Sequence, residues 1–281
     1  METGQKTIQT NNNIAQSKDI VLSIQVSLNG LSFCVLNTEK SEIEFYKSFQ
    51  FEKKLNPGEV LDRLVHQFNT QEELQQDFKN VTVVHDNELS SLVPKPLFNE
   101  DYLADYLKFN SKILRSDYIT YDEIILNDSM NVYVPYVNIN NYLYDRFGEF
   151  EFRHFSTIVI ESILNLEKNA STTKMYAHMS TTHFEIVIID NGQLKLYNTF
   201  EYTTKEDFIY YILFTAEQLE MNPEEFALVI IGDLTTEDEY YQIAYKYVRD
   251  VAIFQSKGTT ITVNNTVDTK CLAHFVMINS F

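Results

Sequence analysis

The stretch Phe184–Phe200, FEIVIIDNGQLKLYNTF, decides the fold of this chain. Two runs rich in apolar residues, Phe184–Ile189 and Leu194–Phe200, flank the tripeptide Asp190-Asn191-Gly192. Asn-Gly is typical of the tight turn of a β-hairpin, because both residues tolerate the left-handed backbone that such a turn needs. The stretch therefore predicts two adjacent antiparallel strands.

The residues around this hairpin extend it into a larger module. Met175–Met179 predicts a strand before the hairpin, and Thr203 or Thr204 is suited to cap a helix that runs to about Leu219. Phe226–Ile231 is almost continuously apolar, as in a strand that is covered on both faces. The predicted order is three strands, a helix and a strand.

The same order occurs earlier in the chain. Its predicted strands and helix are Ile20–Val26, Leu31–Leu36, Ile43–Phe51, a helix from Glu59 to Phe68 or Phe78, and Val81–Val84. Two such copies predict an α/β (mixed α+β) protein with two mixed sheets and flanking helices. We expect a disordered N-terminus over 1–18, a first half with an inserted segment over 19–170, and a second half over 171–281.

Three local predictions complete the reading of the elements. The two prolines of Leu92–Phe98 argue against a regular element there. Thr235 or Thr236 predicts the start of a further helix, and Cys271–Ile278 predicts a late strand.

The duplicated module resembles the superfamily of actin, sugar kinases and heat-shock chaperone ATPases, in which each half is ribonuclease-H-like. The segments Leu92–Phe98, Tyr102-Leu103, Phe109-Asn110 and Val132–Pro135, together with Phe184–Phe200, are similar to a Bacteroidota family known as domain of unknown function 3822. The resemblance covers most of Asp19–Phe281. It implies an actin-like ATPase fold and carries no assigned activity.

The resemblance also implies where a nucleotide would bind. Active members of the superfamily place Asp-x-Gly at the end of the first strand of each half, so that the acid acts through a metal and the glycine lets amides approach phosphates. The matching positions here hold Gln25 and Ser27 in the first half, and His178 and Ser180 in the second. Glutamine and neutral histidine lack the anionic oxygen that Mg²⁺ prefers. We therefore expect no catalytic residue, no metal and no cofactor; ATP stays possible, but the motifs do not support it.

Other residues at these turns keep some binding capacity. Ser180, Thr181 and Thr182 could hold an anion through hydroxyls and amides, or simply satisfy their own turn. Gly232 is what remains of the superfamily's adenosine-binding glycine pair, and Asp233 follows a buried strand, where ligand sites of α/β sheets form. Asp233 also fits a helix-capping role, and Gln25 fits a buried hydrogen bond.

Composition narrows the choice of partner. The formal net charge of −18 argues against nucleic acid and against an anionic membrane surface. The two cysteines, Cys34 and Cys271, have no metal-type spacing, and no secretory signal or membrane-length apolar run is present. We expect a cytoplasmic location and protein partners, with a homodimer left open.

Three functions remain as hypotheses. The preferred one is a degenerate actin-like protein that acts as a non-catalytic binding or scaffolding module. The alternative is a divergent enzyme that binds ATP or a phosphate ligand in the interdomain cleft, with Asp233, Glu185 or Asp190 as acid or base. A third is a membrane-associated assembly protein similar to actin-like division or pilus proteins, which the lack of a basic amphipathic tail disfavours.

Overall fold

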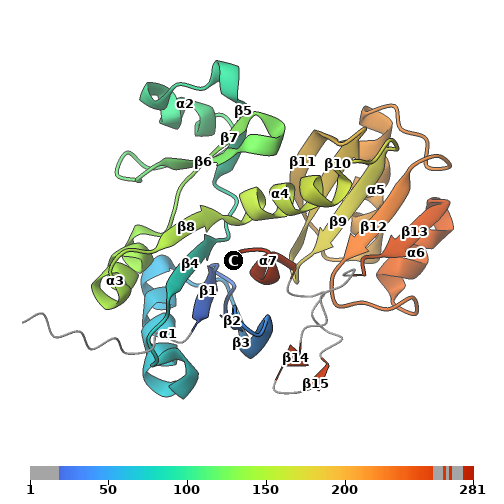
Figure 1. Cartoon of the computed structure of the whole chain (residues 1–281). Coiled ribbons are helices and arrows are strands. Elements are labelled where there is room, and N and C mark those ends of the chain that lie inside the picture. Colours follow the sequence, from blue (N-terminus) through green and yellow to red (C-terminus); the bar gives the residue numbers. More distant parts are fainter. Residues whose placement is uncertain (1–18, 256–261, 264–265, 268–274) are drawn as a thin grey trace, which may run out of the picture.

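The computed structural model describes residues 19–255, 262–263, 266–267 and 275–281 (Figure 1). The predicted disordered N-terminus, 1–18, lies outside these residues, as does Cys271. Cys34, the other cysteine, is buried.

The first lobe is built on a five-stranded mixed sheet with the strand order β3-β2-β1-β4-β8. The three strands of the predicted meander pair antiparallel, whereas β4 runs parallel to β1 and β8 runs parallel to β4. The bounds are β1 (Ile20–Val26), β2 (Gly30–Asn37), β3 (Glu42–Gln50), β4 (Asn80–His85) and β8 (Glu151–His154). The sequence predicted the first four strands and missed the short β8.

The second lobe repeats this sheet strand for strand, with the order β11-β10-β9-β12-β13. Its hairpin turns at Asn191 and Gly192, which both have positive φ, as the Asn-Gly signal predicts. The bounds are β9 (Lys174–Met179), β10 (His183–Asp190), β11 (Gln193–Glu201), β12 (Ala227–Ile231) and β13 (Asp250–Ile253). The duplicated α/β architecture inferred from the sequence is therefore confirmed.

A smaller sheet with the order β5-β7-β6 interrupts the first lobe after β4. It carries the short helix α2 (Leu103–Leu107), and its strands are β5 (Ser90–Pro94), β6 (Thr120–Ile124) and β7 (Ser129–Tyr133). The prediction that Leu92–Phe98 forms no regular element was wrong. β5 is an edge strand that ends at Pro94, where the missing N–H of proline does little harm, and the 3-10 turn η2 (Lys95–Leu97) follows.

Helices cover the outer faces of the two main sheets (Figure 1). α1 (Pro57–Thr70) and α3 (Val137–Phe147) pack on the first sheet, and α5 (Lys205–Gln218) and α6 (Glu239–Tyr247) on the second. α1 stops at Thr70 and does not reach Phe78. α6 starts at Glu239, later than the predicted Thr235 or Thr236. The remaining short elements are the 3-10 turns η1 (Glu72–Leu74), η3 (Glu100–Tyr102) and η4 (Ile125–Asn127), and the paired strands β14 (Thr262–Val263) and β15 (Thr266–Val267).

The inner faces of the sheets are covered by two helices that join the lobes. α4 (Phe155–Glu167) follows β8 of the first lobe, yet it packs in one apolar cluster with Tyr176, Val187 and Ile189 of the second sheet. It lies between the lobes in Figure 1. Because α4 is covered on most sides, its apolar residues do not form a single narrow stripe.

The second joining helix is α7 (Phe275–Ile278), which follows the second lobe but packs against the first. Met277 is buried against Cys34 and Ile43, and the Ser23 hydroxyl lies 2.6 Å from that of Ser280. The predicted strand over Cys271–Ile278 was therefore wrong in its described part. In so short an apolar run, the residue pattern of a strand cannot be told from that of a buried helix. Here the contact with the first sheet favours the helix.

The packing of α4 predicts a sharp contrast between two neighbouring positions. Ile163 is fully buried between the lobes, whereas Leu166 on the same helix is 52% exposed. Ile163→Ala should lower the free energy of unfolding by about 2–5 kcal/mol, because it leaves a cavity. Leu166→Ala should cost about 0.5 kcal/mol or less. Urea unfolding checks both, and equal losses would contradict the packing described here.

The N-cap of α4 predicts acid sensitivity. The backbone N–H of Ser156 donates to Nδ1 of the buried His154, whose Nε2 lies 3.2 Å from the Asn87 carbonyl oxygen. Burial lowers the pKa of His154 from 6.5 to about 3. Between these values the unfolded chain binds a proton that the folded protein rejects, so the free energy of unfolding falls as the pH falls.

His154→Asn removes this titration while keeping a side chain that caps helices well. Between pH 6 and pH 4, the wild type should lose up to about 1.4 kcal/mol per pH unit more than the variant. Urea unfolding at a series of pH values measures this difference. Parallel pH profiles for the two proteins would show that His154 does not carry the effect.

Candidate functional site

A cleft of about 430 Å³ lies between the two lobes. Its walls come from the β1–β2 turn of the first lobe and the β9–β10 turn of the second, and its floor includes Phe155 of α4 with Val276 and Met277 of α7. The cleft therefore forms where the two joining helices meet the ends of the central strands. Its size falls within the usual range for small-ligand sites.

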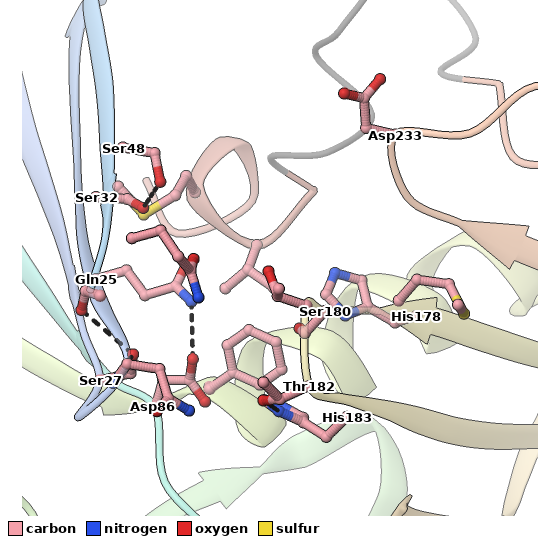
Figure 2. A pocket seen from close by; sticks show the side chains of 18 of the residues that line it. Gln25, Ser27, Ser32, Ser48, Asp86, His178, Ser180, Thr182, His183 and Asp233 are labelled. Carbon is pink, nitrogen blue, oxygen red and sulfur yellow. Dashed lines mark hydrogen bonds between the residues drawn. The ribbon is translucent and has the colours of Figure 1, made fainter. Parts of the chain in front are cut away.

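On the first-lobe side, the predicted position Gln25 is engaged with a carboxylate. Its Nε2 donates to Oδ2 of Asp86 at 3.0 Å (Figure 2). Asp86 directly follows β4, and its backbone is fixed because its N–H donates to the Val26 carbonyl and its own carbonyl accepts from Tyr136 Oη. Burial raises the pKa of Asp86, and the nearby charge of His183 opposes that shift.

The hydroxyl of Ser27 is used within its own turn. Ser27 Oγ donates to the Gly30 carbonyl at 3.2 Å and accepts from the Asn29 N–H at 3.2 Å. This residue lines the cleft, but its hydroxyl closes the β1–β2 turn. Ser32 and Ser48, which were not among the predicted positions, also line the cleft. Their hydroxyl oxygens are hydrogen-bonded to each other at 3.0 Å.

On the second-lobe side, Glu185 lies between two histidines. Its Oε2 is 2.8 Å from Nδ1 of His178, and its Oε1 is 3.2 Å from Nε2 of His183. All three residues belong to β9 and β10, which pair Glu185 with His178 in register. Both histidines line the cleft, while the Glu185 side chain is almost completely buried behind them.

The electrostatics of this trio follow from its geometry. Burial alone would raise the pKa of Glu185, but hydrogen bonds and charge from the two imidazoles outweigh it and lower that pKa to about 2. Burial likewise disfavours the charged form of His183, yet the Glu185 carboxylate raises the pKa of His183 to about 9. At neutral pH, Glu185 is therefore ionised and His183 is protonated, so neither is a good general base.

The turn between β9 and β10 presents hydroxyl groups to the cleft. Its backbone is closed by the Ser180 N–H, which donates to the His183 carbonyl at 2.9 Å, and Tyr202 Oη donates to the Ser180 carbonyl at 2.7 Å. Thr182 Oγ1 lies 3.3 Å from Nδ1 of His183. Thr181 is exposed at the rim.

Gly232 and Asp233 have different places at the end of β12. Gly232 is buried beside the cleft wall, and an added Cβ would lie 3.0 Å from Met179 Cβ. This glycine therefore allows close packing of β12 on β9. Asp233 lines the cleft and projects from the loop after β12, apart from the two histidines (Figure 2).

The structure thus brings most of the predicted positions together in one cleft, namely Gln25, Ser27, His178, Ser180, Thr181, Thr182 and Asp233. It places Asp190 elsewhere, at the hairpin end of β10, where its carboxylate accepts from Thr173 Oγ1. Sequence reasoning missed Asp86. The rule applied to Asp233, an acid just after a buried strand, would have found it, because Asp86 follows the buried β4.

Within 19–255 and the shorter described segments, no group of three or more His, Cys, Asp or Glu residues is arranged to hold a metal ion. None of the helices in those residues combines the length and the apolar character needed to span a bilayer.

Comparison with solved structures defines the class of fold. A Bacteroides thetaiotaomicron protein described as having an actin-like ATPase fold and unknown function superposes with a TM-score of 0.76, at 23% identity, over 94% of this chain and 98% of that one. A chain of the PilM–PilN type IV pilus biogenesis complex gives a TM-score of 0.63, at 7% identity, over 92% and 97%. The protein therefore has the actin-like ATPase fold.

The sequence itself matches the family model for the protein of unknown function DUF3822 over residues 9–251. The chain belongs to that family, as the sequence segments around Leu92–Phe98 and Phe184–Phe200 predicted. A comparison with curated proteins found no match.

The pairing of Glu185 with His183 can be tested by titration. In Glu185→Gln, the charge that holds the proton on His183 is lost, so its pKa should fall from about 9 toward or below the ordinary value of about 6.5. Histidine side-chain NMR from pH 5 to pH 10 measures this. Glu149→Gln, at an exposed position of the first lobe, is the matched control and should leave His183 unchanged. A value still near 9 in Glu185→Gln would refute the pairing.

Proposed function

We propose that this protein is a binding or scaffolding module that uses the actin-like fold without metal-dependent nucleotide hydrolysis. The observation that carries this proposal is the bond between Gln25 and Asp86. At the end of β1, where active relatives of this fold need a free carboxylate for a metal and its waters, an amide donates to an acid instead. The amide thereby occupies one oxygen of the acid that lies nearest to that position.

The second lobe supports the same proposal. Glu185 is tied to both His178 and His183, so its oxygens already have partners. A hard cation such as Mg²⁺ prefers carboxylate oxygens and water, and the second-lobe turn offers it imidazoles and hydroxyls. The cleft itself is open to a ligand, and the fold is compatible with a protein partner, since a chain of the PilM–PilN complex shares it. We place this module in the cytoplasm.

The alternative function is a divergent enzyme that binds ATP or another phosphate ligand, and fewer observations support it. Of its three candidate acids, Glu185 is held ionised between two histidines and Asp190 lies outside the cleft. Asp233 remains as a cleft residue with an accessible carboxylate. The alternative therefore depends on this one side chain.

Calorimetry separates the two functions. We expect titration of the protein with ATP or ADP to give no Mg²⁺-dependent binding, and incubation with ATP and Mg²⁺ to release no phosphate above the rate of a protein-free sample. Tight Mg²⁺-dependent binding together with turnover would overturn the proposal.

If phosphate release is seen, Asp233→Ala assigns it. Loss of activity in this variant, with Asp62→Ala as a control at an exposed position of α1, would support the divergent enzyme. Equal activity in both variants and in the wild type would exclude Asp233 as its acid or base.

A further inference from the structure

The lining of the cleft holds more carboxyl groups than cationic groups. Among the described residues that line it, none is Lys or Arg, whereas Asp86, Asp233 and Asp238 contribute carboxyl groups. Glu185 lies behind the two histidines, and its negative charge is offset by that of the protonated His183. A triphosphate would therefore meet acids at both lobes without a long-chain cation to offset them. A cation would meet a field of favourable sign, which cleft walls concentrate.

Two of these acids occupy equivalent places in the duplicated sheets. Asp86 directly follows β4, the fourth strand of the first copy, and Asp233 comes shortly after β12, the fourth strand of the second. The strand pairings place both acids next to the central strand of their sheet. His85, just before Asp86, pairs with Val26 of β1, and Ile231, two residues before Asp233, pairs with His178 of β9. The two carboxyl groups therefore approach the cleft from opposite lobes.

Aromatic rings add a second feature that suits a cation. Tyr202 and Tyr240 both line the cleft, with ring centroids 5.4 Å apart in an edge-to-face arrangement. Tyr46 lines the cleft from the first lobe. Ring faces attract ammonium and guanidinium groups, and the aliphatic stems of Lys and Arg pack well on such surfaces.

We propose, on the basis of the binding role above, that the cleft receives Lys or Arg side chains from a basic segment of a partner protein. Asp86, through the oxygen that does not accept from Gln25, and Asp233 bind the cationic groups, and the tyrosines contact the side-chain stems. A protein segment fits better than a free amine, because Thr181, Thr182 and Asp233 are exposed at the rim, where a chain can continue beyond the cleft. The net charge of −18 steers a basic partner toward this acidic protein.

The buried environment of Asp86 gives the interaction a pH signature. Burial raises the pKa of this carboxyl, and a bound ammonium or guanidinium group would lower it again. Binding should therefore weaken as the pH falls and Asp86 takes up a proton. The other titratable groups that face Asp86 are His183, Glu185 and His178, so the pH profile must be compared with that of an Asp86 variant.

Fluorescence anisotropy tests the proposal with a labelled hexapeptide in which Lys alternates with Gly, against a matched peptide with Gln in place of Lys. The full chain should bind the Lys peptide saturably and the Gln peptide at least about tenfold more weakly. The double variant Asp86→Asn/Asp233→Asn should weaken Lys-peptide binding on the order of tenfold. Asp62→Asn/Glu149→Asn makes the same change in net charge at exposed positions outside the cleft and should have little effect.

Three results would overturn the proposal. These are equal binding of the Lys and Gln peptides, equal weakening by the cleft and control variants, and displacement of the Lys peptide by spermidine at equal concentration, which would indicate a free amine as the ligand. Asp233→Asn alone, at an exposed position, serves if the double variant does not fold. If the Lys peptide does not bind and ATP is not hydrolysed, this inference is wrong but the proposed function is not contradicted. If ATP is hydrolysed in an Mg²⁺-dependent reaction, the proposed function itself is wrong.

Discussion

The exchange of helices between the two lobes is the constraint on which the rest of the structure depends. Each five-stranded sheet has an inner face on the side opposite its own outer helices. It carries buried apolar residues, such as Cys34 in the first sheet and Val187 in the second, and in the first sheet also the buried Ser23. α4 comes from the first copy and covers the second sheet, while α7 comes from the second copy and covers the first. Because each lobe is completed by the other's helix, the lobes are held together by their hydrophobic cores and not by surface contacts alone.

This exchange also places the cleft. Phe155, the first residue of α4, and Val276 and Met277 of α7 form its floor. The ring of His178 lies against Phe155 and against Phe275 of α7. A histidine in that position is orientated by apolar contacts on its faces and by Glu185 at its edge. The position of His178 in the cleft wall thus depends on the same helices that join the lobes, so a change in their packing would alter the cleft.

The sequence predicted the parts of the fold that rest on local patterns and missed those that rest on contacts between distant segments. Phe184–Phe200 formed the expected hairpin because apolar alternation and the Asn-Gly turn agree with each other. The segment Phe275–Ile278 is a helix that packs on the first sheet, and its own sequence gives no sign of that distant contact. At the site, the turn residues could be placed from their strands, but the bond from Gln25 to Asp86 joins residues on β1 and after β4, and only the paired strands bring them together.

Duplication explains why the two sides of the cleft can differ so much in chemistry while sharing one backbone. Equivalent turns follow the first strand of each copy, yet one holds an amide bonded to a carboxyl group and the other holds imidazoles bonded to a carboxylate. In both lobes the side chain at the end of the first strand is already hydrogen-bonded within the protein. A ligand that depended on these two positions would have to break hydrogen bonds within the protein. A ligand bound by the other oxygen of Asp86, by Asp233 and by the tyrosine rings avoids that cost. Hydrogen bonding within the protein therefore favours ligand contacts with cleft residues other than Gln25 and His178.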